Sequence, residues 1–129
     1  MERRAINPWK WQDNFGFVQA NEVTGAQRTL ICSGQTSVDE NGAPLHAGDM
    51  AAQMNQALDN LETVLKAAGM SPENVIKTTI YTTDVDAFLG ASMANRERTS
   101  ATKSATTLIG VTRLAFPALM VEIEAIAVA

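Results

Sequence analysis

The sequence predicts an α+β domain in which two helices pack on one face of a mixed β-sheet. Three observations carry this prediction. Segments with strand and helix patterns follow one another in the order strand, strand, helix, strand, helix, strand, strand. Residues 50–68 have an apolar stripe at helical spacing, and residues 118–128 alternate as a strand does. With 129 residues, we expect one domain, residues 1–129, whose core buries about two-thirds of the surface of the unfolded chain.

The N-terminal segment combines basic and aromatic residues. Arg3 and Arg4 lie before any strand pattern, and we expect this end of the chain to be frayed. Residues 8–20 are interpreted as an arm that leads into a short strand. Dense aromatic residues of this kind usually anchor a terminus to the core, and the arm carries Trp9, Trp11, Phe15 and Phe17.

The arm is followed by a strand and a tight turn. Residues 27–35 are predicted as a strand that ends at Ser33-Gly34, where glycine permits a close approach of the backbone. Residues 38–45 contain the Asn41-Gly42 turn that is typical of a small hairpin.

The longest helix is predicted over residues 50–68. Asp49 is its natural N-cap, and Gly69 follows at the position that favours a left-handed residue. Its apolar stripe consists of Met50, Met54, Ala57, Leu58, Leu61, Leu65 and Ala68.

The second half of the chain begins with two helix-start signals. Ser71-Pro72 opens a single helical turn, and Asp84 caps a second helix whose Val85, Phe88 and Leu89 are expected to face inward. The predicted segments are a turn at 71–74, a strand at 75–83, a helix at 85–98, a polar loop at 99–104, a strand at 106–115 and the final strand at 118–128. Two helices cover only one face of the sheet, so association is the natural way to bury the other.

The final strand carries two carboxylates. Glu122 and Glu124 point to the same face because strand side chains alternate, and Val121 and Ile123 point to the other. A buried carboxylate costs several kcal/mol unless it is paired or hydrogen-bonded. The pair therefore marks either a site or interface, or an edge strand whose outer face is wet.

The composition excludes several classes of function. The net charge is −4, and no block of basic residues favours nucleic acid or an anionic membrane. Cys32 is the one cysteine, so no internal disulfide forms, and it reads as an inert strand residue. No leader or membrane-spanning run is evident, and no His/Cys cluster has metal-ligand spacing. We expect a cytoplasmic protein with no metal or cofactor.

Four segments together resemble the RidA/YjgF family, also called L-PSP endoribonuclease-like. They are Ile31-Cys32-Ser33-Gly34-Gln35, the helical segment from Asp49 to Gly69, Val75-Ile76-Lys77-Thr78-Thr79-Ile80-Tyr81, and Val121-Glu122-Ile123-Glu124-Ala125-Ile126-Ala127. The resemblance extends from about Phe15 to Val128 and lies in the order and spacing of the segments. It implies a chorismate-mutase-like fold and a homotrimer in which three sheets form a barrel. It also implies small-molecule pockets between subunits.

The resemblance assigns roles to individual residues. Glu122 falls on the acid that positions or activates the attacking water, and Ser33-Gly34 on the strand end that lines the pocket. Glu122 is therefore the candidate catalytic residue. The candidate substrate-binding residues are Phe17, Ser33, Gly34, Ser92, Thr106 and Leu108.

Four of these positions depart from the pattern of active members. Phe17 replaces a tyrosine, Ser92 an asparagine, and Leu108 a cysteine. Thr106 replaces the arginine that grips the substrate carboxylate, and threonine offers neither its charge nor its paired hydrogen bonds. The best-known members hydrolyse 2-aminoacrylate and its imine tautomer, so we expect little turnover of such acids.

Three functions are consistent with these residues. The first is an enamine or imine hydrolase, deaminase-like, that uses Glu122 as general acid/base on a substrate not anchored by an arginine. The second is a non-catalytic ligand-binding or regulatory trimer. The third is an endoribonuclease, which the acidic chain disfavours, since its one histidine, His46, lies on the predicted hairpin away from any phosphate clamp.

Overall fold

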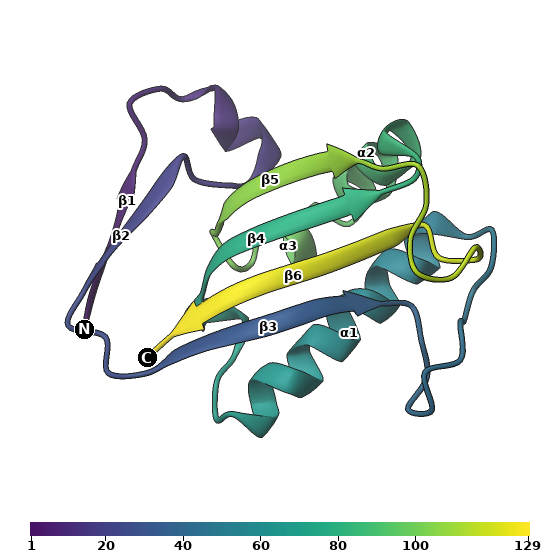
Figure 1. Ribbon diagram of the computed structural model, residues 1–129. Helices are drawn as coiled ribbons and strands as arrows, with labels where there is room; N and C mark the ends of the chain where they lie inside the picture. Colours follow the sequence, from purple (N-terminus) through teal and green to yellow (C-terminus); the bar gives the residue numbers. More distant parts are fainter.

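The computed structural model describes residues 1–129 and confirms the α+β prediction. A four-stranded mixed sheet in the order β3-β6-β4-β5 is backed on one face by two main helices (Figure 1). β4 and β5 run parallel, and the other neighbouring strands run antiparallel. The elements are β1 (Glu2–Ile6), a 3-10 turn η1 (Trp11–Phe15), β2 (Ala20–Thr24), β3 (Thr29–Thr36), α1 (Met50–Ala67), a 3-10 turn η2 (Pro72–Asn74), β4 (Val75–Thr82), α2 (Val85–Ala94), α3 (Arg96–Thr99), β5 (Ala105–Gly110) and β6 (Val121–Val128).

Helix α1 begins and ends where its capping residues predict. The Asp49 side chain accepts the N–H of Ala52 at 3.0 Å, which satisfies one of the free donors of the first turn. At the other end Gly69 adopts φ +71°, and the N–H of Met70 returns to the carbonyl of Leu65 at 2.9 Å. This is the Schellman arrangement, which a left-handed glycine makes possible.

The core lies between α1, α2 and the adjacent face of the sheet. Val121, Ile123, Ala125 and Ala127 of β6 are all at most 2% exposed and face the helices. Glu122 and Glu124 point to the opposite face, as the strand alternation predicts. We call these two sides the helix face and the open face.

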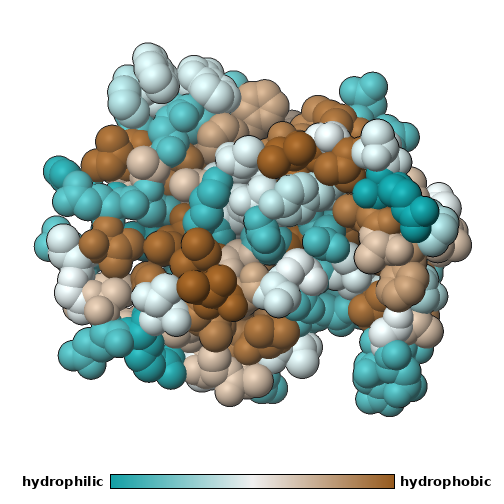
Figure 2. Space-filling view, in the orientation of Figure 1, coloured by the Kyte–Doolittle hydropathy of each residue, from teal (hydrophilic) through white to brown (hydrophobic).

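Strand β6 is central, because β3 and β4 pair with it on either side. Of the two alternatives for residues 118–128, the edge strand with a wet outer face is therefore wrong. The open face is covered by no element of this chain (Figure 1), and apolar and polar side chains are interspersed on it (Figure 2). Ile31, which lies opposite Ile126 on this face, is 77% exposed. The open face therefore carries the uncovered apolar surface that the sequence predicts.

The N-terminal segment is ordered, and the expectation of a frayed end is wrong. β1 pairs with β2 as a hairpin beside the sheet (Figure 1). The Arg3 guanidinium donates to the carbonyls of Glu73, Thr102 and Lys103 at 2.7–2.9 Å. The prediction that aromatic residues anchor this end is also wrong in part, since Trp9, Trp11 and Phe15 are more than half exposed.

Several predicted boundaries shift. The second helix ends at Ala94 and a separate turn of helix follows, because the chain bends at Asn95. Within α2 only Phe88 of the three expected residues is buried, whereas Val85 and Leu89 are more than a third exposed. The strand predicted at 106–115 ends at Gly110, the final strand begins at Val121, and the 38–45 hairpin is reduced to one bridge between Val38 and Pro44. None of the helices has both the length and the apolar character of a membrane span.

Candidate functional site

The strand register divides the predicted site residues between the two faces of the sheet. Thr106 and Leu108 of β5 lie opposite Thr78 and Ile80 of β4, which belong to the helix face. Glu122 lies opposite Tyr81 on the open face. Glu122 and Thr106 of one subunit therefore lie on opposite faces of the sheet.

The predicted site residues on the helix face line a cavity. The cavity has a volume of about 260 Å³, close to the lower end for small-molecule sites. It lies between the sheet, α1, α2 and the segment that follows η1. Four predicted residues are in its wall: Phe17, Ser92, Thr106 and Leu108.

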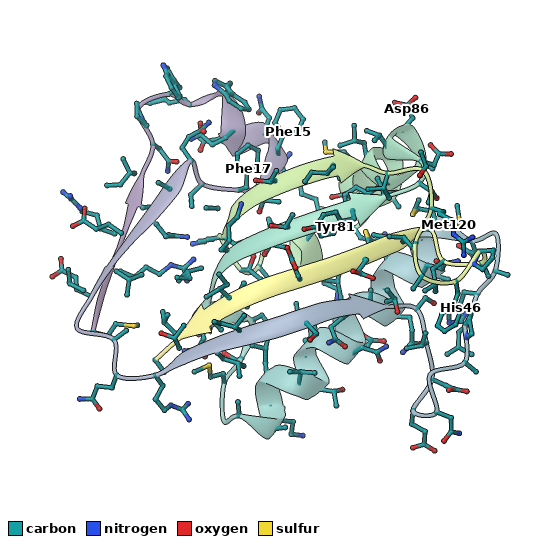
Figure 3. All side chains as sticks on the ribbon, in the orientation of Figure 1. Phe15, Phe17, His46, Tyr81, Asp86 and Met120 are labelled. Atoms are coloured by element: carbon teal, nitrogen blue, oxygen red, sulfur yellow. The ribbon has the colours of Figure 1, made fainter.

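Aromatic residues in the connection between β1 and β2 close one side of this cavity. Phe15 and Phe17 contribute to the wall, and Figure 3 shows both beside β5. The Phe17 ring packs edge-on against Trp11 at a centroid distance of 5.7 Å. Between them, Gly16 adopts φ +77°, and a Cβ built there would lie 2.5 Å from Cβ of Ser100. Glycine at this position therefore allows the aromatic segment to pack against α3.

A cluster of four hydroxyl groups, those of Thr78, Thr102, Ser104 and Thr106, lies in the cavity wall. Ser104 is its centre, since its Oγ lies 2.8 Å from Thr78 Oγ1, 3.0 Å from Thr106 Oγ1 and 3.0 Å from Thr102 Oγ1. Ser104 and Thr78 are less than a tenth exposed. Sequence reasoning found only Thr106 of this group. The signal was present, because hydroxyl residues recur at every second position from 102 to 106.

Arg98 is the one charged residue in the cavity wall, and its guanidinium is already paired. It donates to both the carbonyl and the side-chain oxygen of Asn55. It also forms ion pairs with Asp59 and Glu62 on the surface of α1. Two carboxylates of α1 therefore pair with this cation.

The other predicted site residues, Ser33, Gly34 and Glu122, lie on the open face around a bulge in β3. The pairing of β3 with β6 is interrupted between Cys32 and Gln35, and Ser33 and Gly34 occupy the interruption. A Cβ built on Gly34 would lie 2.4 Å from a carboxylate oxygen of Glu122. The carboxylate of Glu122 thus lies directly against bare glycine backbone, and it forms no ion pair within the chain.

Tyr81 adds a hydroxyl group to the same face. It donates to a carboxylate oxygen of Glu124 at 2.6 Å, and Figure 3 shows it over β4 and β6. This hydrogen bond raises the pKa of the Tyr81 phenol, and desolvation and the charges of Glu124 and Glu122 raise it further. The bond explains how Glu124 is accommodated and supports a structural role for both residues.

Two other residues are remote from both groups. Cys32 is buried in the core, and this burial raises the pKa of its thiol, as suits an inert strand residue. His46 is exposed in the loop before α1, at the end of the molecule opposite to Phe17 (Figure 3). No group of three or more His, Cys, Asp or Glu side chains is arranged to hold a metal ion.

Comparison with known proteins identifies the family. The model of the endoribonuclease L-PSP family matches residues 15–129. The chain belongs to the RidA/YjgF family. A RutC family protein from Pyrococcus horikoshii is 36% identical over 107 residues, which are 83% of this chain and 84% of that protein. The 2-iminobutanoate/2-iminopropanoate deaminase of Escherichia coli K12 is 34% identical over 102 residues, 77% of this chain and 78% of that enzyme.

Solved structures of RidA-family members share this fold. The conserved Rid family protein YyfB from Yersinia pestis superposes with a TM-score of 0.88 at 36% identity, over 100% of both chains. The YjgF product of Escherichia coli gives a TM-score of 0.65 at 34% identity, over 87% of each chain. The YyfB match includes residues 1–14, with strand β1, which precede the residues that the family model matches.

Proposed function

We propose that the protein is a hydrolase of small imines or enamines, and that its site is completed between subunits of a homotrimer. In this arrangement Glu122 and the Ser33-Gly34 bulge of one protomer face the cavity of a neighbour. The family relationship supports the chemistry, because relatives with more than 30% identity are named imine deaminases. The location we propose is cytoplasmic, where a free buried thiol such as Cys32 stays reduced.

The position of Glu122 is the observation that carries this proposal. Its carboxylate lies against Gly34, free of any ion pair, on a sheet face that the chain leaves uncovered. A carboxylate held in this way can accept a proton from water and return it, as a general acid/base must. A second protomer on the open face would also bury apolar side chains such as Ile31.

The chemistry requires one water molecule and no cofactor. Glu122 takes a proton from water as the oxygen bonds to the C=N carbon, the π electrons move to the nitrogen, and Glu122 gives its proton to that nitrogen. The hydroxyl proton of the tetrahedral adduct then passes through Glu122 to the nitrogen, the C–N bond breaks to release ammonia, and the oxygen becomes a carbonyl. An imine and water thus give a carbonyl compound and ammonia, and Glu122 returns to its starting state.

A ligand-binding or regulatory trimer is the second candidate, and the cavity wall favours it. Thr106, Phe17 and Leu108 replace residues that supply charge, hydroxyl and thiol groups in active members. A cavity of this size with an apolar wall can bind a small molecule without reacting with it.

Ammonia release tests the proposal directly. Neutral imines, generated in situ from primary amines by a flavin-dependent amine oxidase, are supplied to the native protein and to the Glu122→Gln and Glu124→Gln variants. We expect Glu122→Gln to remove hydrolysis while the protein stays assembled, and Glu124→Gln to weaken assembly or stability first. Hydrolysis that persists in Glu122→Gln contradicts the proposal, and so does a stable monomer in light scattering at micromolar concentration.

The Thr106→Arg variant separates the two candidates. If the scaffold is a hydrolase that lacks its carboxylate anchor, this variant gains activity on 2-iminopropanoate that depends on Glu122. The lost charged contact corresponds to about 2–5 kcal/mol, or tens- to thousands-fold in rate. If neither form hydrolyses any imine, the binding function is the better conclusion.

A further inference from the structure

The hydroxyl cluster leaves one proton without a strong acceptor. Ser104 Oγ donates one hydrogen bond and accepts two, and its three neighbours fill all three positions. Two neighbours therefore donate to Ser104, and the third accepts and keeps its own proton. Thr102 is one of the donors, so the remaining proton belongs to Thr78 or Thr106.

The protein offers this proton no acceptor at the usual hydrogen-bond distance. From Thr106 it reaches only the carbonyl of Ser104 at 3.3 Å, well beyond the usual 2.7–2.8 Å for a hydroxyl donor. No further acceptor is within hydrogen-bond distance of Thr78 Oγ1. Because both residues line the cavity, an occupant with an acceptor atom at this point gains a hydrogen bond.

The charges around the cavity decide what kind of acceptor fits. Arg98 is the only charged residue in the wall, and it is paired with Asp59 and Glu62. An anion entering the cavity loses its hydration and meets no free cation. Within one subunit a cation meets no carboxylate in the wall, because none of the lining residues is acidic. The wall that this subunit supplies therefore favours neither sign of charge.

We infer that the cavity binds an uncharged small molecule with an apolar body and one carbonyl-type acceptor, which the Ser104 cluster holds by a hydrogen bond. The inference rests on the proposed function only in taking this cavity as the ligand site. It separates this protein from relatives named for 2-imino acids, whose substrates carry a carboxylate. Under the proposed function the substrate is then a neutral imine or enamine.

Three probes of matched shape test this inference: butanamide, butanoate and butylammonium at pH 7.5. Binding to the native protein is followed by the methyl NMR signals of Met54 and Met93, which lie in the cavity wall. We expect butanamide to bind at least about tenfold more tightly than either ion, as one uncompensated charge requires. Equal or tighter binding of butanoate overturns the inference, as does the absence of binding by all three.

Two isosteric variants locate the hydrogen bond. Thr106→Val removes one hydroxyl of the cluster, and we expect butanamide to bind about five- to tenfold more weakly. Thr107→Val is the control, because Thr107 is the next residue of β5 and points to the open face. An equal effect of the two variants overturns the assignment to the cluster. Thr106→Arg should reverse the preference toward butanoate.

The binding experiment and the hydrolysis experiment test the two proposals independently. Binding is measured on probes that cannot be hydrolysed as imines, so it is read independently of catalysis. If butanamide binds best but no imine is hydrolysed, the neutral cavity stands and the hydrolase proposal falls. If imines are hydrolysed but butanoate binds best, the hydrolase proposal stands and this inference falls.

Discussion

Replacing Gly34 by alanine tests the contact that places Glu122. The added Cβ would lie 2.4 Å from a carboxylate oxygen, 2.6 Å from Cδ and 2.7 Å from Cγ of Glu122. All three atoms belong to one flexible side chain, so the side chain and not the backbone must move. Gly34 is not among the glycines with positive φ, so its own backbone accepts an alanine.

The expected change in stability is small because two effects oppose each other. Forcing Glu122 from its rotamer costs about 0.5–1.5 kcal/mol. Restricting the unfolded chain by replacing glycine with alanine stabilises by about 0.4–1 kcal/mol. We therefore expect Gly34→Ala to change the free energy of unfolding by less than about 1 kcal/mol. The carboxylate moves by about 1 Å, enough to reduce hydrolysis about 100-fold if Glu122 is the acid/base.

A double-mutant cycle with Glu122→Ala isolates this contact. Truncation removes all three clashing atoms, so Gly34→Ala in that background should stabilise the protein by about 0.4–1 kcal/mol. Urea unfolding at one fixed protomer concentration measures all four proteins, since subunit association makes stability concentration-dependent. Gly90→Ala is the matched control, because a Cβ there meets no atom within 4 Å. A coupling energy indistinguishable from zero would refute the reasoning.

Two further predictions concern Tyr81 and Gln53. Tyr81 is the only tyrosine, so the ultraviolet absorbance of tyrosine reports its titration alone. Because folding raises its pKa, Tyr81 stabilises the folded protein below pH 10, and this stabilisation is lost as the pH rises through the higher pKa of the folded state. Glu124→Gln should move that titration toward pH 10, and an unchanged titration would contradict the assignment. Gln53, 0% exposed, donates to the carbonyls of His46 and Ala118 and accepts the N–H of Met120 at 2.8–3.1 Å. Gln53→Leu removes three hydrogen bonds and leaves two backbone groups, the Ala118 carbonyl and the Met120 N–H, without a partner, because the His46 carbonyl still accepts the N–H of Asp49. It should cost about 2–5 kcal/mol in urea unfolding, whereas Gln56→Leu on the same helix should cost less than about 1 kcal/mol.

The sequence predicted best those features whose causes are local. Helix α1 was placed to within one residue because its cap, its apolar stripe and its terminal glycine all lie within twenty or so neighbouring positions. That Glu122 and Glu124 point to the same face of the sheet was predicted because strand alternation depends only on adjacent residues.

Features that depend on distant contacts were missed. The ordered N-terminus is held by Arg3 through carbonyls of residues 73, 102 and 103, which no local pattern reveals. Strand β5 was predicted too long because its pairing with β4 ends at Gly110, although the sequence remains strand-like beyond it. The division of the site residues between two faces required the register of three strands, and a single sequence contains none of it.

That division also bears on how the site can vary. The four positions at which the resemblance implies departures from active members, Phe17, Ser92, Thr106 and Leu108, all lie in the cavity wall on the helix face. Glu122 and Gly34 lie on the open face, and there the chain keeps the acid and the small residue that the resemblance predicts. Because the sheet separates the two groups within a subunit, a substitution in the cavity changes which charge and shape the wall accepts without moving Glu122. If the site is completed between subunits, the group that binds the substrate and the group that activates water can therefore change independently.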